Sequence, residues 1–222
     1  MNHLFPAIVR TLVTAATLAT VAFSASAQGL SGDAKAGQSK AEMCIGCHGI
    51  PGYQNSFPEV HKVPQISGQS DKYIAAALTA YKKGDRKHPT MRGIAGALSE
   101  QDMADLAAFY ATEVSKTAPE APRAASVAAA ALIEKGACAS CHGANFSKPI
   151  DPSYPKLAGQ HADYLYVALK AYTVEGNAVI GRNNAIMAGI AKQYSHAEMR
   201  EMAKYLASAE GELAVVPQAR FK

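Results

Sequence analysis

All four cysteines of the chain lie in two copies of the pattern C-x-x-C-H. The residues are Cys44, Cys47 and His48 in the first copy, and Cys138, Cys141 and His142 in the second. This pattern is the attachment signal for c-type haem. Two thiols on one side of a turn can add to the two vinyl groups of a porphyrin, and the next imidazole can bind the iron. We therefore expect two covalently bound haem c groups.

Closely spaced cysteines have other interpretations, namely disulfides, a zinc site or a thioredoxin-like thiol pair. A thioredoxin-like pair needs a βαβ context, whereas this chain has helical periodicity. A single zinc site would need the two pairs to meet in space, and two copies in matching domains would keep them apart. Neither explains a histidine at the same place twice, so haem attachment is the better interpretation.

The sequence around the two pentads is duplicated. The segment "PQISGQSDKYIAAALTAY" aligns with "PKLAGQHADYLYVALKAY" at a shift of 91 positions, and "RKHPTMRGIA" aligns with "RNNAIMAGIA" at a shift of 96. Matching blocks in the same order indicate two copies of one fold. Each copy has segments of helical apolar spacing and no convincing alternating strand, so we predict an all-α protein.

The N-terminus predicts export. A basic residue, an apolar stretch and small residues before Ala27 are typical of a signal peptide, and the stretch is shorter than the roughly 20 residues that span a bilayer. We expect cleavage after residue 27 and a periplasmic mature protein. Residues 115–125 are rich in Ala and Pro, which predicts a linker between one domain at 28–114 and another at 126–222. The weak net charge of +4 carries no signature of nucleic-acid binding.

Met91 and Met187 are the predicted sixth ligands of the two irons. They occupy matching loop positions, 43 and 45 residues after the histidine of their own pentad. A His/Met pair gives a closed iron suited to electron transfer rather than to substrate chemistry. Met103, Met199 and Met202 have helical apolar spacing and are expected in the core.

Four further histidines lack a counterpart in the other copy, so we expect them at the surface, with only His88 able to replace a methionine as ligand. They are His61, His88, His161 and His196.

Other residues could support the haems. A ligating histidine usually donates its second ring N–H to a fixed acceptor, and the carbonyls of Pro64 and Pro155 are candidates. Arg86 and Arg182 each precede a methionine by five residues and could either pair with haem propionates or remain solvated. The paired tyrosines of the middle helices are expected to line the core and the haem edge. They are Tyr73, Tyr81, Tyr164 and Tyr172.

With these residues in place, the chain resembles the cytochrome c4 family of dihaem carriers. The resemblance rests on "CIGCHG" and "CASCHG", on "PQISGQ" and "PKLAGQ", and on both methionine segments. It implies two tandem class I cytochrome c-like domains with His48/Met91 and His142/Met187 as axial pairs. It also implies a non-enzymatic periplasmic carrier in a respiratory chain. Its expected partners are a quinol–cytochrome c reductase as donor and a terminal oxidase as acceptor, with peripheral association at the membrane surface.

Another function remains open from the sequence. The chain could be the cytochrome subunit of a periplasmic dehydrogenase, such as a flavocytochrome that oxidises sulfide. A dihaem peroxidase or a thiosulfate dehydrogenase is less consistent with the residues, because both irons have a methionine available and no cysteine is left to act as a ligand.

Overall fold

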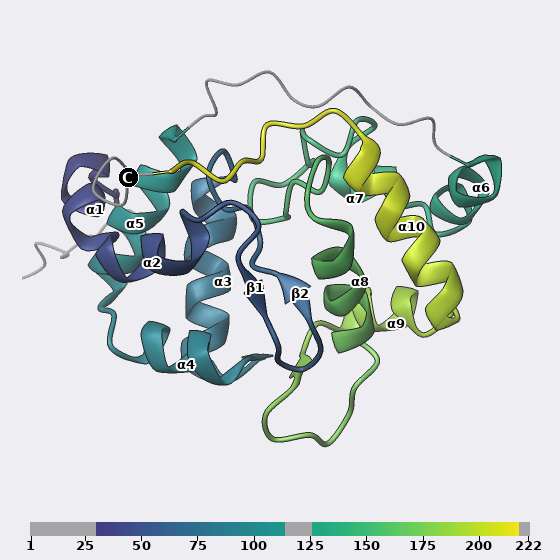
Figure 1. The fold of residues 1–222 in the computed structure, drawn as a ribbon, viewed down its shortest axis with the longest axis horizontal. Coiled ribbons are helices and arrows are strands. Elements are labelled where there is room, and N and C mark those ends of the chain that lie inside the picture. The colour runs from purple at the N-terminus through teal and green to yellow at the C-terminus, as the bar shows by residue number, and fades with distance from the viewer. Residues whose placement is uncertain (1–29, 114–125, 218–222) are drawn as a thin grey trace, which may run out of the picture.

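The computed structural model describes residues 30–113 and 126–217 of the chain (Figure 1). The predicted leader at 1–27 and the predicted linker at 115–125 lie outside these residues. The helices of the first copy and those of the second form two groups that lie side by side (Figure 1).

The described helices follow the same order in both copies, as expected of a duplicated all-α fold. The first copy has α1 (Ala34–Lys40), α2 (Glu42–His48), α3 (Asp71–Lys83), α4 (Pro89–Gly96) and α5 (Glu100–Thr112). The second has α6 (Val127–Lys135), α7 (Ala139–His142), α8 (Ala162–Ala171), α9 (Ala185–Ala191) and α10 (His196–Ser208). Within the described ranges, no helix combines the length and the apolar character needed to cross a membrane.

Each copy has its own hydrophobic core. In the first, α5 packs against α1 and α3 and buries Leu106 and Phe109. In the second, α10 packs against α6 and α8 and buries Leu206. The three methionines predicted to lie in the core are buried, which confirms that prediction. They are Met103, Met199 and Met202.

Capping boxes fix where the last helix of each copy begins. The Ser99 hydroxyl accepts from the Asp102 backbone N–H, and the Asp102 carboxylate accepts from the Ser99 backbone N–H. Ser195 and Glu198 repeat this arrangement at α10. These caps satisfy N–H groups that have no partner inside the helix. They also separate α5 and α10 from α4 and α9, the helices that carry Met91 and Met187.

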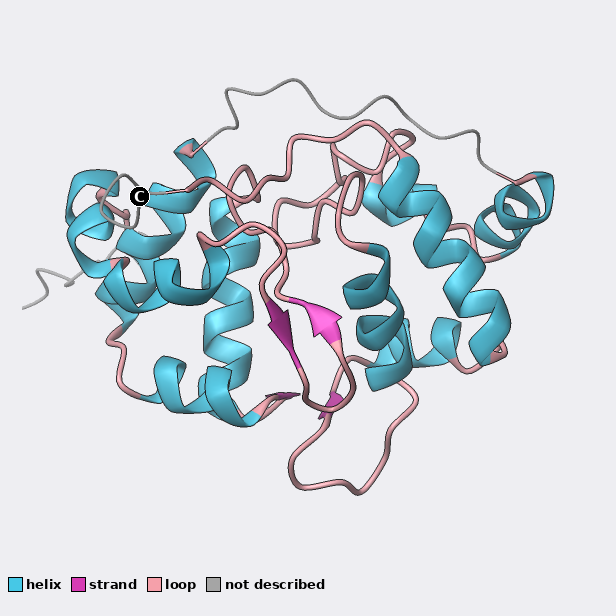
Figure 2. Cartoon of the chain, in the orientation of Figure 1, coloured by secondary structure: helices cyan, strands magenta, loops and turns pink. Residues whose placement is uncertain are grey.

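Four strands of two residues complete the described part of the fold (Figure 2). In the first copy, β1 (Gln54–Asn55) pairs antiparallel with β2 (His61–Lys62). The antiparallel pair of β3 (Arg86–Lys87) and β4 (Gly181–Arg182) joins the two copies. Such short strands show no alternating pattern in the sequence, so they were not predicted.

Candidate haem-binding sites

The two pentads lie at the ends of short helices. In the first copy, all of Cys44, Cys47 and His48 belong to α2; in the second, Cys138 is the N-cap of α7 and His142 is its last residue. None of the four cysteines forms a disulfide. Burial raises the pKa of Cys44 and Cys138. Redox-active thiols need a lowered pKa, so these two do not suit the thiol-redox interpretation.

Each pentad histidine is oriented by a proline carbonyl. His48 Nδ1 lies 2.8 Å from the Pro64 carbonyl oxygen, and His142 Nδ1 lies 3.0 Å from that of Pro155. The sequence-based prediction of these two acceptors is confirmed. Since a carbonyl can only accept, Nδ1 carries the proton and Nε2 has the lone pair that an iron needs. Burial lowers the pKa of both histidines and so favours this neutral form.

Met91 and Met187 lie in the first turn of a helix, α4 and α9 respectively, and not in a loop as we predicted. Each is fixed by the side chain three residues earlier. The Met187 backbone N–H donates to Asn184 Oδ1 at 3.0 Å, and that of Met91 donates to His88 Nδ1 at 3.5 Å. A loop was predicted because these helices span only seven or eight residues. The repeat nevertheless contained a sign that a helix begins here, because the N-cap residues His88 and Asn184 occupy aligned positions.

The prediction that the four unmatched histidines lie at the surface is wrong for His61. This residue is 4% exposed, donates from Nδ1 to the Glu59 carbonyl oxygen at 2.8 Å, and lies near Tyr164 of the other domain. His161 is half-buried in the same interface, and His88 is half-buried as the cap of α4. An unmatched residue can be buried where the copies meet, because an interface need not be symmetric in every side chain.

Two arginines meet between the domains, opposite one another on β3 and β4. Arg86 donates to the hydroxyls of Tyr73 at 3.2 Å and Tyr164 at 2.5 Å, and Arg182 donates to that of Tyr164 at 3.1 Å. Their guanidinium groups also lie over the rings of Tyr81 and Tyr172. The alternative that these arginines are solvated is therefore wrong.

The positive charge of this Arg–Tyr cluster is incompletely satisfied. Arg86 Nε is buried and has no hydrogen-bond partner among the described residues. Burial alone would raise the pKa of Tyr164, but the Arg86 and Arg182 guanidinium groups outweigh it and lower that pKa to about 8. Two cations in one partly buried place, with one N–H unpaired, suit an anionic group.

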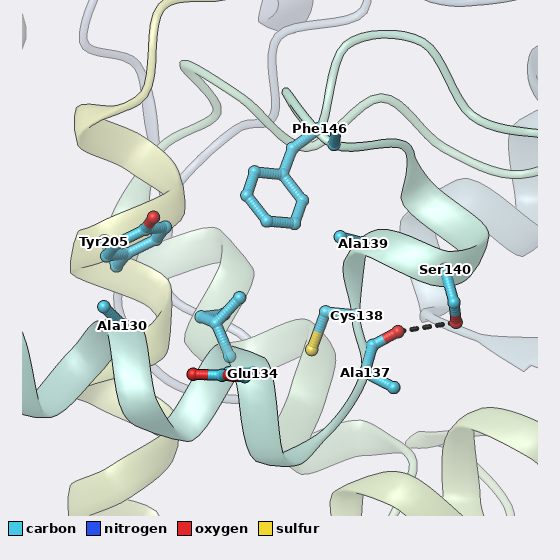
Figure 3. A pocket seen from close by; sticks show the side chains of 10 residues that line it. Ala130, Glu134, Ala137, Cys138, Ala139, Ser140, Phe146 and Tyr205 are labelled. Atoms are coloured by element: carbon cyan, nitrogen blue, oxygen red, sulfur yellow. Dashed lines mark hydrogen bonds between the residues drawn. The ribbon is translucent and has the colours of Figure 1, made fainter.

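The second copy has a pocket beside its pentad that the sequence did not reveal. The pocket has a volume of about 410 Å³, and Cys138, Phe146, Glu134 and Tyr205 are among its lining residues (Figure 3). It lies between α6, α10 and the start of α7. Ala137 and Phe146 here have positive φ values of 47° and 58°, an uncommon conformation for residues other than glycine. The first copy has no such residue at its pentad.

The donor sets fit two haem c groups. Each copy supplies two cysteines outside any disulfide, an imidazole with its Nδ1 already engaged, and a thioether sulfur on a capped helix. Within the described ranges, no three His, Cys, Asp or Glu side chains lie as a metal cluster would require. The alternative of a zinc site therefore finds no donor set there.

Comparison with known proteins identifies a cytochrome c domain in each copy. The family model for cytochrome c matches twice, at residues 34–112 and 126–210. Cytochrome c4 of Azotobacter vinelandii is 31% identical over 192 residues, covering 79% of this chain and 88% of that protein. The thiosulfate dehydrogenase electron acceptor of Thiomonas intermedia is 30% identical, covering 76% of this chain and 79% of that protein.

A solved structure has the same architecture. Reduced recombinant cytochrome c4 from Pseudomonas stutzeri matches with a TM-score of 0.61 at 26% identity, covering 81% of this chain and all of that one. The chain thus belongs to the cytochrome c family and, within it, to the cytochrome c4 family of dihaem electron carriers. Its cofactors are two covalently bound haem c groups.

Proposed function

We propose that the protein carries electrons in the periplasm from a quinol–cytochrome c reductase towards a terminal oxidase and catalyses no reaction of its own. The observation that carries this proposal is the duplication of one complete donor set on either side of a hydrogen-bonded domain interface. Two similar sites held in one body suit a relay rather than a substrate pocket. Haem c supplies a one-electron Fe(III)/Fe(II) couple when bound at such sites.

In this proposal the axial pairs are His48/Met91 and His142/Met187. The cysteines fix each porphyrin covalently, the proline carbonyls orient the two imidazoles, and the capped first turns of α4 and α9 hold the two sulfurs. The Arg–Tyr cluster would accept haem propionates, which would supply the anion that Arg86 Nε lacks.

Export to the periplasm with cleavage after Ala27 is part of the proposal and rests on the leader sequence. Peripheral association with the membrane is a further part, because both proposed partners lie in the membrane. N-terminal sequencing of the purified protein should begin at Gln28. A protein that begins at Met1 would contradict the export step.

The ligand assignment predicts the outcome of two substitutions. Met91→Ala and Met187→Ala should each abolish about half of the Met–iron absorption band, because each removes one of two equivalent thioether ligands. The measurement is a redox titration of the purified protein that follows this band. Met103→Leu is the matched control: it alters a buried methionine of α5 and should leave the band intact. An unchanged band in either alanine variant would reject the assignment.

A second candidate function is an electron acceptor for a periplasmic dehydrogenase. It is favoured by the similarity to a protein named as a thiosulfate dehydrogenase electron acceptor, and the flavocytochrome alternative belongs to the same class. Rapid-mixing kinetics can separate the candidates. Reduction of the protein by a quinol–cytochrome c reductase, faster than by thiosulfate dehydrogenase with thiosulfate, supports the first; the opposite order supports the second.

A further inference from the structure

The glutamines of the repeated "GQ" pairs, Gln69 and Gln160, lie in the interface between the domains. Each is 4% exposed. Gln69 Nε2 donates to the Lys156 carbonyl oxygen at 3.1 Å, and Gln69 Oε1 accepts from the Lys156 backbone N–H at 3.0 Å. One side-chain amide therefore satisfies both backbone groups of one residue in the other domain.

Gln160 makes the same two contacts in the opposite direction. Its Nε2 donates to the Gln65 carbonyl oxygen at 2.8 Å, and its Oε1 accepts from the Gln65 backbone N–H at 3.0 Å. At the shift of 91 that relates the copies, Gln65 corresponds to Lys156 and Gln69 to Gln160. The contact is thus reciprocal, as in the isologous interface of a twofold-symmetric dimer.

We call Gln65 and Lys156, whose backbone groups the two glutamines bind, the clamped residues. Each directly follows the proline that orients a pentad histidine. In the first domain, Pro64 accepts from His48 and precedes Gln65. The corresponding residues of the second domain are Pro155, His142 and Lys156. The acceptor of each histidine is therefore one peptide unit from a residue that the other domain fixes.

We infer that Gln160 positions the proximal ligand His48 and that Gln69 positions His142, so each domain sets part of the reduction potential of the other domain's haem. This inference rests on the proposed axial ligands. The hydrogen bond from Nδ1 orients a ligating histidine and raises its basicity, which tunes the iron. An acceptor that is held in place keeps this hydrogen bond strong.

The same contacts predict that loss of either glutamine amide raises the reduction potential of the haem in the other domain. Without the glutamine amide, both backbone groups of the clamped residue lose a partner inside the interface, and such a loss is unfavourable. The segment then shifts towards water or other partners, and the neighbouring proline carbonyl shifts with it. A weaker Nδ1 hydrogen bond makes the imidazole a poorer donor, which favours Fe(II) and raises the potential.

The test is a crosswise comparison of two variants of the full-length holoprotein. Gln160→Met and Gln69→Met keep the side-chain length and remove both hydrogen bonds. Redox titrations followed by paramagnetic NMR give a potential for each haem, with the signals assigned by means of Met91→Ala. We expect Gln160→Met to raise the potential of the haem at His48, and Gln69→Met to raise that of the haem at His142.

Two controls accompany these variants. Gln193→Ala removes an exposed glutamine whose side chain donates, within the described ranges, to the Gly189 carbonyl alone. Lys170→Gln removes an ion pair with Glu59 that also crosses the interface. Neither should shift one haem selectively. A shift in the domain that carries the substitution, an equal shift in both haems, or no shift would overturn the inference.

Hydrogen exchange of the wild-type holoprotein gives an independent test that needs no variant to fold. The backbone amides of Gln65 and Lys156 should exchange slowly, because their release requires the domains to part. Exchange as fast as that of exposed loops would overturn the inference. The wild-type spectrum is recorded first: absence of low-spin His/Met haem there would reject the proposed ligation itself, which is a different failure.

Discussion

His88 and Asn184 differ in chemistry but occupy the same place in the two copies. Each side chain caps a short helix by accepting a backbone N–H from the methionine three residues later. Burial lowers the pKa of His88. The lowered pKa favours the neutral ring, the form that keeps an acceptor nitrogen. The role of His88 is thus to hold the turn that carries Met91, although its type and spacing first made it a rival ligand.

This role predicts different results for two substitutions of His88. His88→Asn installs the cap of the second copy and should leave stability nearly unchanged. His88→Ala removes the cap and should lower the free energy of unfolding by about 1 kcal/mol, the usual effect of losing a helix N-cap. Denaturant titrations measure both. Loss of the Met–iron band in His88→Asn would contradict the capping role and would point to ligation by His88 itself.

The sequence predicted the residues whose signal is local. The pentads and the prolines that orient His48 and His142 follow from spacing and from the internal repeat, and the same signals give the prediction that Met91 and Met187 are ligands. It did not predict the burial of His61, the Arg–Tyr cluster or the contacts of Gln69. Those features depend on how the copies pack against each other, and the apolar periodicity of one copy carries no information about its partner. The short helices at Met91 and Met187 were missed because two turns give too little periodicity.

The crossing of α1 and α5 depends on a glycine and a carboxylate. Gly37 is buried, and a Cβ built on it would lie 2.0 Å from the Asp105 carbonyl oxygen, far inside contact distance. The Asp105 carboxylate accepts from the Asp33 backbone N–H at 2.9 Å and pairs with Lys40 at 2.6 Å. Because Gly37 has no Cβ, the two helices can approach closely, and the Asp105 carboxylate of α5 holds them together through its contacts with Asp33 and Lys40. No glycine lies within α6, and the pocket beside Cys138 opens there.

Gly37→Ala should destabilise the first domain by forcing these two backbones apart. We expect the free energy of unfolding to fall by about 1–3 kcal/mol, as when atoms are added to a packed core. Gly96→Ala is the matched control, because a Cβ at that helical position meets no atom within 4 Å. It should be neutral or slightly stabilising. Equal thermal melting of the two variants would show that the close approach does not matter.

The same crossing makes stability depend on pH. The Asp33 N–H, then Lys40 and Gln101, lower the pKa of Asp105 to about 2, below the ordinary value of about 3.9. A lowered folded-state pKa stabilises the fold above about pH 4, and this contribution is lost as the pH falls from about 4 to about 2. Asp105→Asn should therefore lower the melting temperature at pH 7, and its difference from wild type should narrow towards pH 2. A constant difference across this range would contradict the assignment.

At the scale of the whole molecule, the segment that follows α10, as far as residue 217, returns to the first domain. After α10 the chain runs back across the interface towards the first domain (Figure 1). The Ala214 backbone N–H donates to the Ser67 carbonyl oxygen at 3.0 Å, and Glu212 pairs with Lys156 at 2.6 Å. Leu213, which lies between Glu212 and Ala214 in the sequence, is buried. This returning segment, residues 211–217, therefore binds beside the Gln69 contact and braces it.

A chain that ends at Glu210 should lose this brace. We expect its free energy of unfolding to fall by about 1.5–3 kcal/mol, the range for losing the burial of one large apolar side chain such as Leu213. A chain that ends at Pro217 keeps every one of these contacts and is the control. Calorimetry of both holoproteins provides the measurement. If the two chains melt together, the returning segment contributes nothing to the stability of the pair.

The reciprocal contacts of Gln69 and Gln160, here called the glutamine clamp, also affect the order in which the protein assembles. Gln69 and Lys156 are 87 positions apart, and Gln65 and Gln160 are 95 apart. Synthesis from the N-terminus completes the first domain well before either partner exists, so the clamp is among the last contacts to form. A half-made chain can already hold a full set of ligands for its first haem while the backbone of Gln65 still faces water. We therefore expect the haem at His48 to reach its final potential only after the second domain has folded and Gln160 binds the backbone of Gln65.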